Sequence, residues 1–439
     1  MLYIANKKTS LIIFKILMRK KRDLPTIILL ILSGECIYIL PYVLARIFRP
    51  TFLDVFNLSN FELGSLFSVY GIVAIFSYLF GGVIADNFSS RKLISTALFL
   101  TALGGIFLAT FPSYNILKII YGYWGITTVL LFWGAMIKAT RLWGGSNSQG
   151  RAYGYLDGGR GIVAALIGSI SVFIFSISLA NDISSSNIIE RKEAFKYVIL
   201  FSSFLISIVG LLVLLFMKTK EDVKSANHSS INSIKKIKEV LKLKTVWLLM
   251  IIIMSAYVGY KTTDIYSLYA SDIMFFDQIN ASRVGSLQLY LRPIVCVLIG
   301  LLADRTNSSS WTIIGFITML FGASIFAVGI INSKMNFIFI LSLIIVAVGT
   351  YAARALYYAI FQEGNIPIGI MGTAVGIISV VGYTPDIFAS PVMGYFLDNY
   401  PGNLGHQYVF SMLVVFSLFG LIASIKFAKI SNKTFKLIV

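Results

Sequence analysis

The chain has 439 residues, of which 57% are hydrophobic and 13% charged, and its mean hydropathy is +0.84. Soluble globular proteins carry roughly 25% charged residues, so this composition indicates a protein whose solvent is lipid. The net charge of +18 does not indicate nucleic-acid binding, because the basic residues lie in short connections and tails, and no soluble domain is long enough to read DNA or RNA.

Residues 1–23 are rich in lysine and arginine and precede a long apolar stretch. A signal peptide also begins with basic residues, but this apolar stretch is too long and lacks a small-residue cleavage site. We therefore expect a cytoplasmic basic tail that leads into the first spanning helix.

A spanning helix needs about 20 mainly apolar residues, and twelve stretches meet that requirement. Their approximate limits are 24–47, 63–85, 93–111, 115–137, 152–180, 196–217, 245–270, 283–303, 311–331, 335–361, 369–397 and 406–428. The sequence therefore predicts an all-α integral membrane fold with twelve transmembrane helices.

Basic residues predict the orientation of these helices. The N-terminal tail, the turn with Arg91 and Lys92, the 218–244 connection and the C-terminal tail at 429–439 all fall on one side of the membrane. That side is expected to be cytoplasmic, with both termini on it. A bacterial inner membrane is the expected location.

The 218–244 connection is predicted to separate two six-helix bundles, residues 24–217 and 245–428. Within it, Ile231, Ile234, Ile237 and Leu241 share one helical face with lysines between them. This pattern is typical of an amphipathic helix on the inner membrane surface, bound to anionic lipid. A regulatory role for this segment is the alternative.

A repeated motif indicates that the two halves are related. Gly82 precedes Asp86 by four residues at the end of the second apolar stretch, and Gly300 precedes Asp304 in the same way at the end of the eighth. Two such copies in corresponding places are typical of a duplicated secondary transporter. The sequence thus predicts two pseudo-symmetric bundles.

The spacing Gly-x-x-x-Asp-x-x-x-x-Arg-Lys between the second and third helices, with the duplication and the long basic connection, resembles the major facilitator superfamily. The second copy departs from the motif, because three serines follow Asn307 where a basic pair would stand. The stretch Gly150–Arg160 and the run Gly382–Asp386 resemble a bacterial group near the organophosphate:phosphate antiporters and sulfosugar permeases. By this resemblance, Asp86, Arg91 and Lys92 join cytoplasmic helix ends and release during switching, and Asp304 is their counterpart.

Glu35 is predicted to lie near the middle of the membrane, because it is roughly 16 Å along the first helix from Leu24. No basic residue stands at helical spacing from it. A buried carboxylate without a partner favours protonation near neutral pH, as a coupling residue requires. The alternative is a permanent pair with an arginine from another helix.

Lys261 and Asp264 stand three residues apart on one face of the seventh helix, beside several tyrosines. In the resembled superfamily the first and seventh helices line the central cavity, and organophosphate antiporters place a basic residue on each. Lys261 matches that position, and Arg46 is the candidate on the first helix. Arg46 could instead extend to the outer headgroups.

Other ionisable residues within the apolar stretches are further candidates. Asp157 and Arg160 are expected to form a structural ion pair, a gate or a substrate contact. Arg292 and Arg354 have no acid nearby on their own helices and could pair with Asp386 or with substrate. The expected substrate contacts are Lys261, Arg46, Arg354, Arg292, Tyr38 and Tyr260, and the expected coupling residues are Glu35, Asp264 and Asp386.

Basic groups in these helices slightly outnumber acidic ones, which favours an anionic substrate. The leading hypothesis is a secondary active transporter for a sugar phosphate, sulfonate or carboxylate, working by alternating access as a monomer, either proton-coupled or exchanging a counter-anion. The alternatives are an exporter of amphipathic drugs or lipids, a proton-coupled permease for a neutral or zwitterionic solute, and a transport-incompetent sensor.

No enzyme is predicted. The sequence has no ATP-binding Gly-x-x-x-x-Gly-Lys-Ser/Thr run, and His228 and His406 lie far apart in connections without a metal-binding set of carboxylates. Cys36 and Cys296 lie inside apolar stretches and are interpreted as core residues. No cofactor and no metal are expected.

Overall fold

The computed structural model describes residues 24–144, 149–179, 187–218, 233–356, 360–364, 366 and 371–438. Every regular element within these ranges is a helix, and eleven helices there are long and apolar enough to cross a membrane. The predicted all-α membrane fold is confirmed.

The helices that precede the 218–244 connection form the first half of the chain. They are α2 (Leu24–Cys36), α3 (Leu44–Ile47), α4 (Arg49–Phe56), α5 (Asn60–Asn87), α6 (Ser90–Leu108), α7 (Tyr114–Gly125), α8 (Gly134–Gly144), α9 (Gln149–Ser178) and α10 (Ile188–Phe216). Two π-helical segments, Ile39–Val43 and Ile126–Trp133, join α2 to α3 and α7 to α8. Wide turns of this kind are frequent at functional sites.

The later helices form the second half. They are α11 (Ser233–Leu241), α12 (Lys244–Thr262), α13 (Tyr266–Asp272), α14 (Gln278–Arg305), α15 (Ser308–Val328), α16 (Asn336–Leu356), α17 (Ile360–Glu363), α18 (Met371–Gly382), α19 (Pro385–Asn399) and α20 (Asn403–Ile438). A short 3-10 turn, Thr263–Ile265, joins α12 to α13. The helix α20 continues past the limit of 428 expected for the last span.

One expected span is not a single helix. The segment predicted at 369–397 forms α18 and α19, with a break between Gly382 and Pro385. Proline has no backbone N–H and fits the first turn of a helix, so a new helix begins at Pro385. Asp386 therefore lies directly after a complete interruption of the helix.

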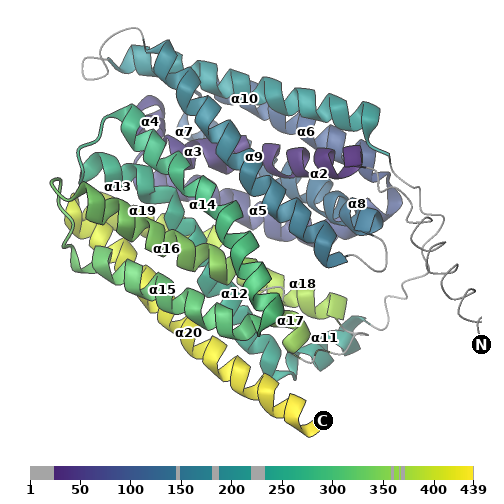
Figure 1. The fold of residues 1–439 in the computed structure, drawn as a ribbon. Coiled ribbons are helices and arrows are strands. Elements are labelled where there is room, and N and C mark those ends of the chain that lie inside the picture. The colour runs from purple at the N-terminus through teal and green to yellow at the C-terminus, as the bar shows by residue number, and fades with distance from the viewer. Residues whose placement is uncertain are drawn as a thin grey trace, which may run out of the picture.

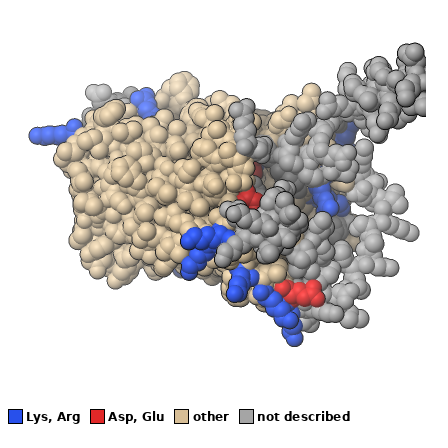
Figure 2. Space-filling model, turned by 60° about the horizontal axis from the view of Figure 1, so that its bottom comes forward, with Lys and Arg blue, Asp and Glu red and all other residues tan. Residues whose placement is uncertain are grey.

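The two halves occupy separate parts of the molecule. Figure 1 shows α6, α9 and α10 at the top, α15, α17 and α20 toward the bottom, and α5 and α14 between them. Two close packings join them, α5 against α19 and α9 against α14. In Figure 2 one broad face is tan, and the blue side chains visible on it gather near its ends, as expected for a belt that contacts lipid.

Part of the predicted amphipathic linker helix is present as α11, which lies against α18. Val240 is buried, whereas Ile237 and Leu241 of the predicted apolar face are exposed. Ile231 and the side chain of Ile234 lie outside the described residues. The exposed apolar side chains are available to a membrane surface.

Candidate transport site

Charged side chains from both halves meet in the interior of the helix bundle. Those that are almost fully buried and form ion pairs are Glu35, Arg46, Arg160, Lys261, Asp264 and Arg292. Charges are retained at such depth only when they are paired, because an isolated ion there is costly. The pairs sort into two clusters.

The first, here called the neutral cluster, consists of Arg46, Lys261, Asp264 and Asp386. Arg46 Nε lies 2.5 Å from Asp264 Oδ1, and Lys261 Nζ lies 3.3 Å from Asp264 Oδ2 and 3.5 Å from Asp386 Oδ1. Two cations thus face two carboxylates from α3, α12, α19 and the turn after α12. The formal charges cancel.

Aromatic side chains complete this cluster. The hydroxyl of Tyr257 donates to Asp386 at 3.1 Å, and Arg46 Nη1 donates to the hydroxyl of Tyr260 at 2.9 Å. Lys261 Nζ lies 4.4 Å from the ring centroid of Tyr42 and 4.6 Å from that of Phe67, positions suited to cation–π attraction. Lys261 is therefore enclosed by rings and carboxylates.

The second, here called the arginine cluster, consists of Glu35, Asp157, Arg160 and Arg292. Arg160 Nε donates to Glu35 Oε2 at 3.2 Å, and Arg292 Nη1 lies 3.7 Å from the same oxygen. Asp157 Oδ1 lies 3.6 Å from Arg160 Nη1, but its side chain is 62% exposed. Two buried guanidinium groups thus share one buried carboxylate.

Tyrosine rings connect the arginine cluster to its surroundings. Arg160 Cζ lies 5.6 Å from the ring centroid of Tyr38, one turn after Glu35. Arg354 Cζ on α16 lies 3.6 Å from the ring centroid of Tyr260, and Arg46 Cζ lies 4.5 Å from it. Tyr260 therefore contacts guanidinium groups from both halves of the chain.

Several of these polar residues keep some exposure although they contact buried charges. Tyr38, Tyr260, Arg354 and Asp386 are half-buried, and they come from four different elements of the two halves. Partly exposed polar groups at membrane depth are tolerated where they line a water-filled space. Partial exposure of polar groups from both halves is the arrangement expected of the central cavity that the resemblance implies.

At one end the halves are packed too closely for a side chain to enter. A Cβ added to Gly64 of α5 would lie 2.5 Å from the carbonyl oxygen of Ser390, and one added to Gly394 of α19 would lie 2.4 Å from that of Asn60. Asp398 also accepts the backbone N–H groups of Asn60 and Phe61 at the start of α5. A carboxylate is favourable at a helix N-terminus.

The short helix α4 reinforces this closed end. Thr51 Oγ1 donates to Gln278 Oε1 at 2.6 Å, and Asp54 pairs with Arg191 at 2.8 Å. Partial burial raises the pKa of the Asp54 carboxyl, while the Arg191 guanidinium opposes the shift. Contacts between α4 and the second half were not predicted, because nothing in the local sequence distinguishes α4 from a connecting loop.

Toward the other end the packing loosens. Gly161 of α9 still lies against Pro293 of α14, but a Cβ on Gly158 or on Gly300 would meet nothing within 4 Å. Cys296, one turn after Arg292, is partly exposed, whereas Cys36 is buried. The two halves are therefore tightly packed at Gly64 and Gly394, whereas Gly158 and Gly300 face open space.

The structure distinguishes between alternatives for pairing that the sequence left open. Glu35 is paired, because arginines of α9 and α14 reach it from other helices. Arg46 does not extend to the headgroups, because it is buried against Asp264. Asp386 pairs with Lys261, not with Arg292.

The structure confirms the contacts expected within two pairs of residues but does not test the repeated Gly-x-x-x-Asp motif. Lys261 and Asp264 share a face, and Asp157 contacts Arg160, as the spacing of three residues predicted. The side chains of Asp86 and Asp304 lie outside the described residues, so the motif's role stays a prediction; Arg91 is half-buried and Lys92 exposed at the start of α6.

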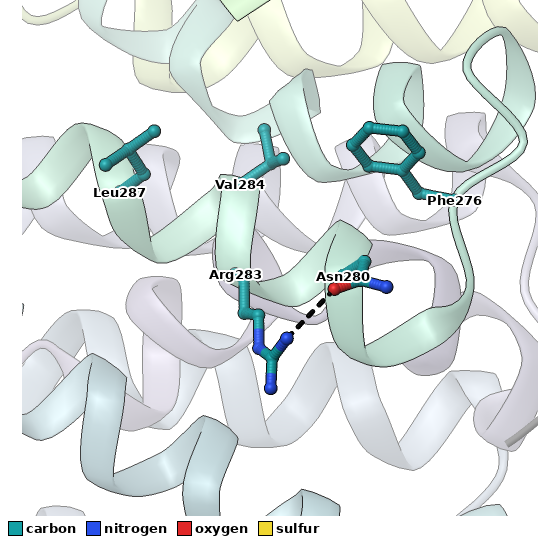
Figure 3. A pocket seen from close by; sticks show the side chains of 5 residues that line it. All are labelled: Phe276, Asn280, Arg283, Val284 and Leu287. Carbon is teal, nitrogen blue, oxygen red and sulfur yellow. Dashed lines mark hydrogen bonds between the residues drawn. The ribbon is translucent and has the colours of Figure 1, made fainter. Parts of the chain in front are cut away.

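A separate pocket of about 350 Å³ lies at the N-terminal end of α14, lined by Phe276, Asn280, Arg283, Val284 and Leu287. In Figure 3 the guanidinium of Arg283 points away from Val284 and Leu287 and bonds to Asn280. Arg283 is exposed, and it precedes Arg292 by roughly 14 Å along the helix. This pocket is distinct from the arginine cluster.

Known proteins resemble the chain over most of its length. Inner membrane proteins YqcE and YihN of Escherichia coli (strain K12) are 29% and 25% identical to it, covering 88% and 91% of this chain and 90% and 94% of their own.

Solved structures share the fold at low identity. A bacterial homologue of the human lysosomal transporter Spinster, inward-facing and unoccupied, has a TM-score of 0.70 at 16% identity, covering 95% of this chain and 98% of its own. The D-xylose-proton symporter has a TM-score of 0.69 at 15% identity, covering 93% of this chain and 97% of its own. A sequence model of the Major Facilitator Superfamily matches residues 30–390. The chain therefore belongs to the Major Facilitator Superfamily.

Proposed function

We propose that this protein is a secondary transporter that moves a small organic anion across the membrane by alternating access. The substrate classes are sugar phosphates, sulfonates and carboxylates. Both termini are cytoplasmic in this proposal, and the membrane is the bacterial inner membrane, as it is in the names of the two Escherichia coli relatives.

One observation supports an anionic substrate: two buried guanidinium groups, Arg160 and Arg292, share one buried carboxylate, that of Glu35. The other carboxylate of this cluster, Asp157, is 62% exposed and lies 3.6 Å from Arg160. Buried cations require compensating anions. Arginine also offers five donors in a planar fork that matches carboxylate, sulfonate and phosphate groups. An anion between α9 and α14 would contact both halves of the chain.

The neutral cluster has a different part in this proposal. Lys261 and Arg46 face two carboxylates, Asp264 and Asp386, whose side chains are 2% and 14% exposed, so their charges are balanced inside the protein before any substrate arrives. In the arginine cluster, by contrast, one of the two carboxylates is 62% exposed. We assign them to holding α3, α12 and α19 together next to the cavity. The arginine cluster, with Tyr38 and Tyr260 beside it, takes the substrate.

Alternating access follows from the uneven packing of the halves. With the N-terminus in the cytoplasm, as the basic residues predict, the end at Gly64 and Gly394 is the outer one. In this proposal the described conformation is closed to the outside and opens inward, past Gly158 and Gly300. Rocking of the halves would reverse these contacts.

The function is tested by thermal unfolding of the purified protein in detergent. The panel contains glycerol 3-phosphate, gluconate, 2-hydroxyethanesulfonate, xylose and a neutral amino acid. A ligand that binds only the folded state raises the melting temperature by mass action. Stabilisation by at least one anion, followed by its uptake into liposomes, is expected. Stabilisation by neutral compounds alone would contradict the anionic substrate.

Substituting Gly64 by alanine is expected to disfavour the outer-closed state, because its Cβ would overlap backbone atoms of Ser390 and Pro391. The readout is maleimide modification of Cys296, the partly exposed one of the two cysteines. Modification should slow severalfold in Gly64→Ala as the inner side closes. Gly158→Ala, which meets no neighbour, is the matched control and should react as the parent does; equal rates in all three proteins would contradict the rocking scheme.

A further inference from the structure

Glu35 occupies the one position in the arginine cluster where an anionic oxygen contacts both guanidinium groups. Its Oε2 lies 3.2 Å from Arg160 Nε and 3.7 Å from Arg292 Nη1. These arginines come from α9 and α14, which belong to different halves, whereas Glu35 comes from α2. A substrate that is to join the halves through both arginines needs the same position.

We infer that Glu35 is an internal competitor for the substrate's anionic group, so that the anion enters the arginine cluster only as Glu35 leaves it and takes up a proton. This inference rests on the proposed function and specifies its coupling: one proton accompanies each anionic group bound. The transported species are an organic anion and a proton moving in the same direction.

The proton is required by the burial of Glu35. Its side chain is only 5% exposed in the paired state. Once the arginines turn to the substrate, Glu35 would be a buried carboxylate without a cation, which is strongly unfavourable. Protonation removes that charge and turns the carboxyl group into a hydrogen-bond donor. The charge of the cluster is then unchanged, because one anion has replaced another.

Among the described residues, Glu35 forms ion pairs with Arg160 and Arg292 alone. The nearest titratable groups along the chain are Cys36 and Tyr38, which are neutral at physiological pH. In the described parts of α9, Asp157 reaches Arg160 from the exposed side. In the described parts of α6, α8 and α10, which also pack on α2, no side chain forms an ion pair with Glu35. Tyr260 of α12 interacts electrostatically with Arg292, Arg354 and Glu35.

The first test uses the parent protein alone. Gluconate or 2-hydroxyethanesulfonate is added to the purified protein in weak buffer near pH 7.5, and the pH is followed with an indicator dye. Both probes stay fully ionised from about pH 6 to 8, so they release and take up no protons themselves. Uptake of about one proton per bound anion is expected. Anion binding without proton uptake would overturn the inference and leave the proposed function intact.

The second test compares affinities at about pH 6 and 8. In the parent, affinity should rise as pH falls, by up to tenfold per pH unit for a one-proton linkage. Glu35→Gln carries no titratable group and no competing charge, so it should bind the probe tightly at both values, with less than a twofold difference. Glu35→Asp should restore the dependence on pH. Asp157→Asn is the matched control, because it removes the exposed carboxylate from the same arginine; it should keep the dependence.

The outcomes separate the two proposals. Equal affinity and equal pH dependence in the parent and Glu35→Gln would refute the competition while anion transport stands. If no anion binds either protein at either pH, and a neutral solute does, the proposed function fails and the inference with it. Binding of an anion by Glu35→Gln but not by the parent at high pH supports the inference.

Discussion

Asp264→Asn is expected to destabilise the folded protein by about 3–5 kcal/mol, the cost of leaving a buried charge without its partner. Asp264 is 1% exposed and lies against both Arg46 and Lys261. Asparagine fills nearly the same volume, so the change is one of charge. After it, two buried cations face only the carboxylate of Asp386.

The measurement is the melting temperature of the purified protein in detergent, with the yield of folded protein as a second readout. Asp54→Asn is the matched control, because it makes the same substitution in an ion pair with Arg191 whose members are 42% and 25% exposed. Exposed ion pairs contribute about 0–1 kcal/mol to the free energy of unfolding. Similar melting temperatures for the two variants would contradict the account of the neutral cluster.

A second substitution tests whether the destabilisation of Asp264→Asn comes from uncompensated buried charge. Arg46→Met added to Asp264→Asn removes the cation that pairs with Asp264 and leaves Lys261 paired with Asp386, so the cluster is neutral again. The double variant should therefore melt above Asp264→Asn alone. Additive losses would show that Arg46 and Asp264 do not interact in the folded protein.

The fold was predictable because membrane helices follow from composition and length. Apolar runs of about 20 residues fix the spans, and the Gly82 and Gly300 motifs indicate the duplication. The break between Gly382 and Pro385 was predictable only as a kink, since a proline near membrane depth can bend a helix or end it. The π-helical segment after α2 contains Pro41, but a proline does not by itself predict a π-helix rather than a kink.

The charged residues of the site were also predictable, but most of their partners were not. Spacing along one helix indicated the pairs Lys261–Asp264 and Asp157–Arg160. The pair of Glu35 with Arg160 joins residues 125 positions apart, and no local pattern shows which helices pack together. For the same reason the sequence favoured Lys261 and Arg46 as substrate contacts, although their charges are balanced within the neutral cluster.

Arg292→Gln is expected to weaken anion binding by about 2–5 kcal/mol, roughly 30- to 4,000-fold in Kd, the range for truncating one partner of a buried charge pair. Arg292 is 5% exposed, and its ion-pair partner in the described residues is Glu35. Glutamine keeps a hydrogen-bond donor but carries no charge. Arg292→Lys keeps the charge without the planar fork and should give an intermediate affinity.

Arg283→Gln is the matched control for Arg292→Gln, because it makes the same substitution on the same helix, at an exposed arginine bonded to Asn280. It should bind the anion as the parent does, and it also tests whether the pocket in Figure 3 takes part in transport. Thermal shifts against the anion that stabilises the parent most give the affinities. If Arg283→Gln failed to bind while Arg292→Gln bound normally, the substrate would belong in the pocket at the start of α14. The reason is that the affinity for an anion falls most when the cation in contact with it is removed.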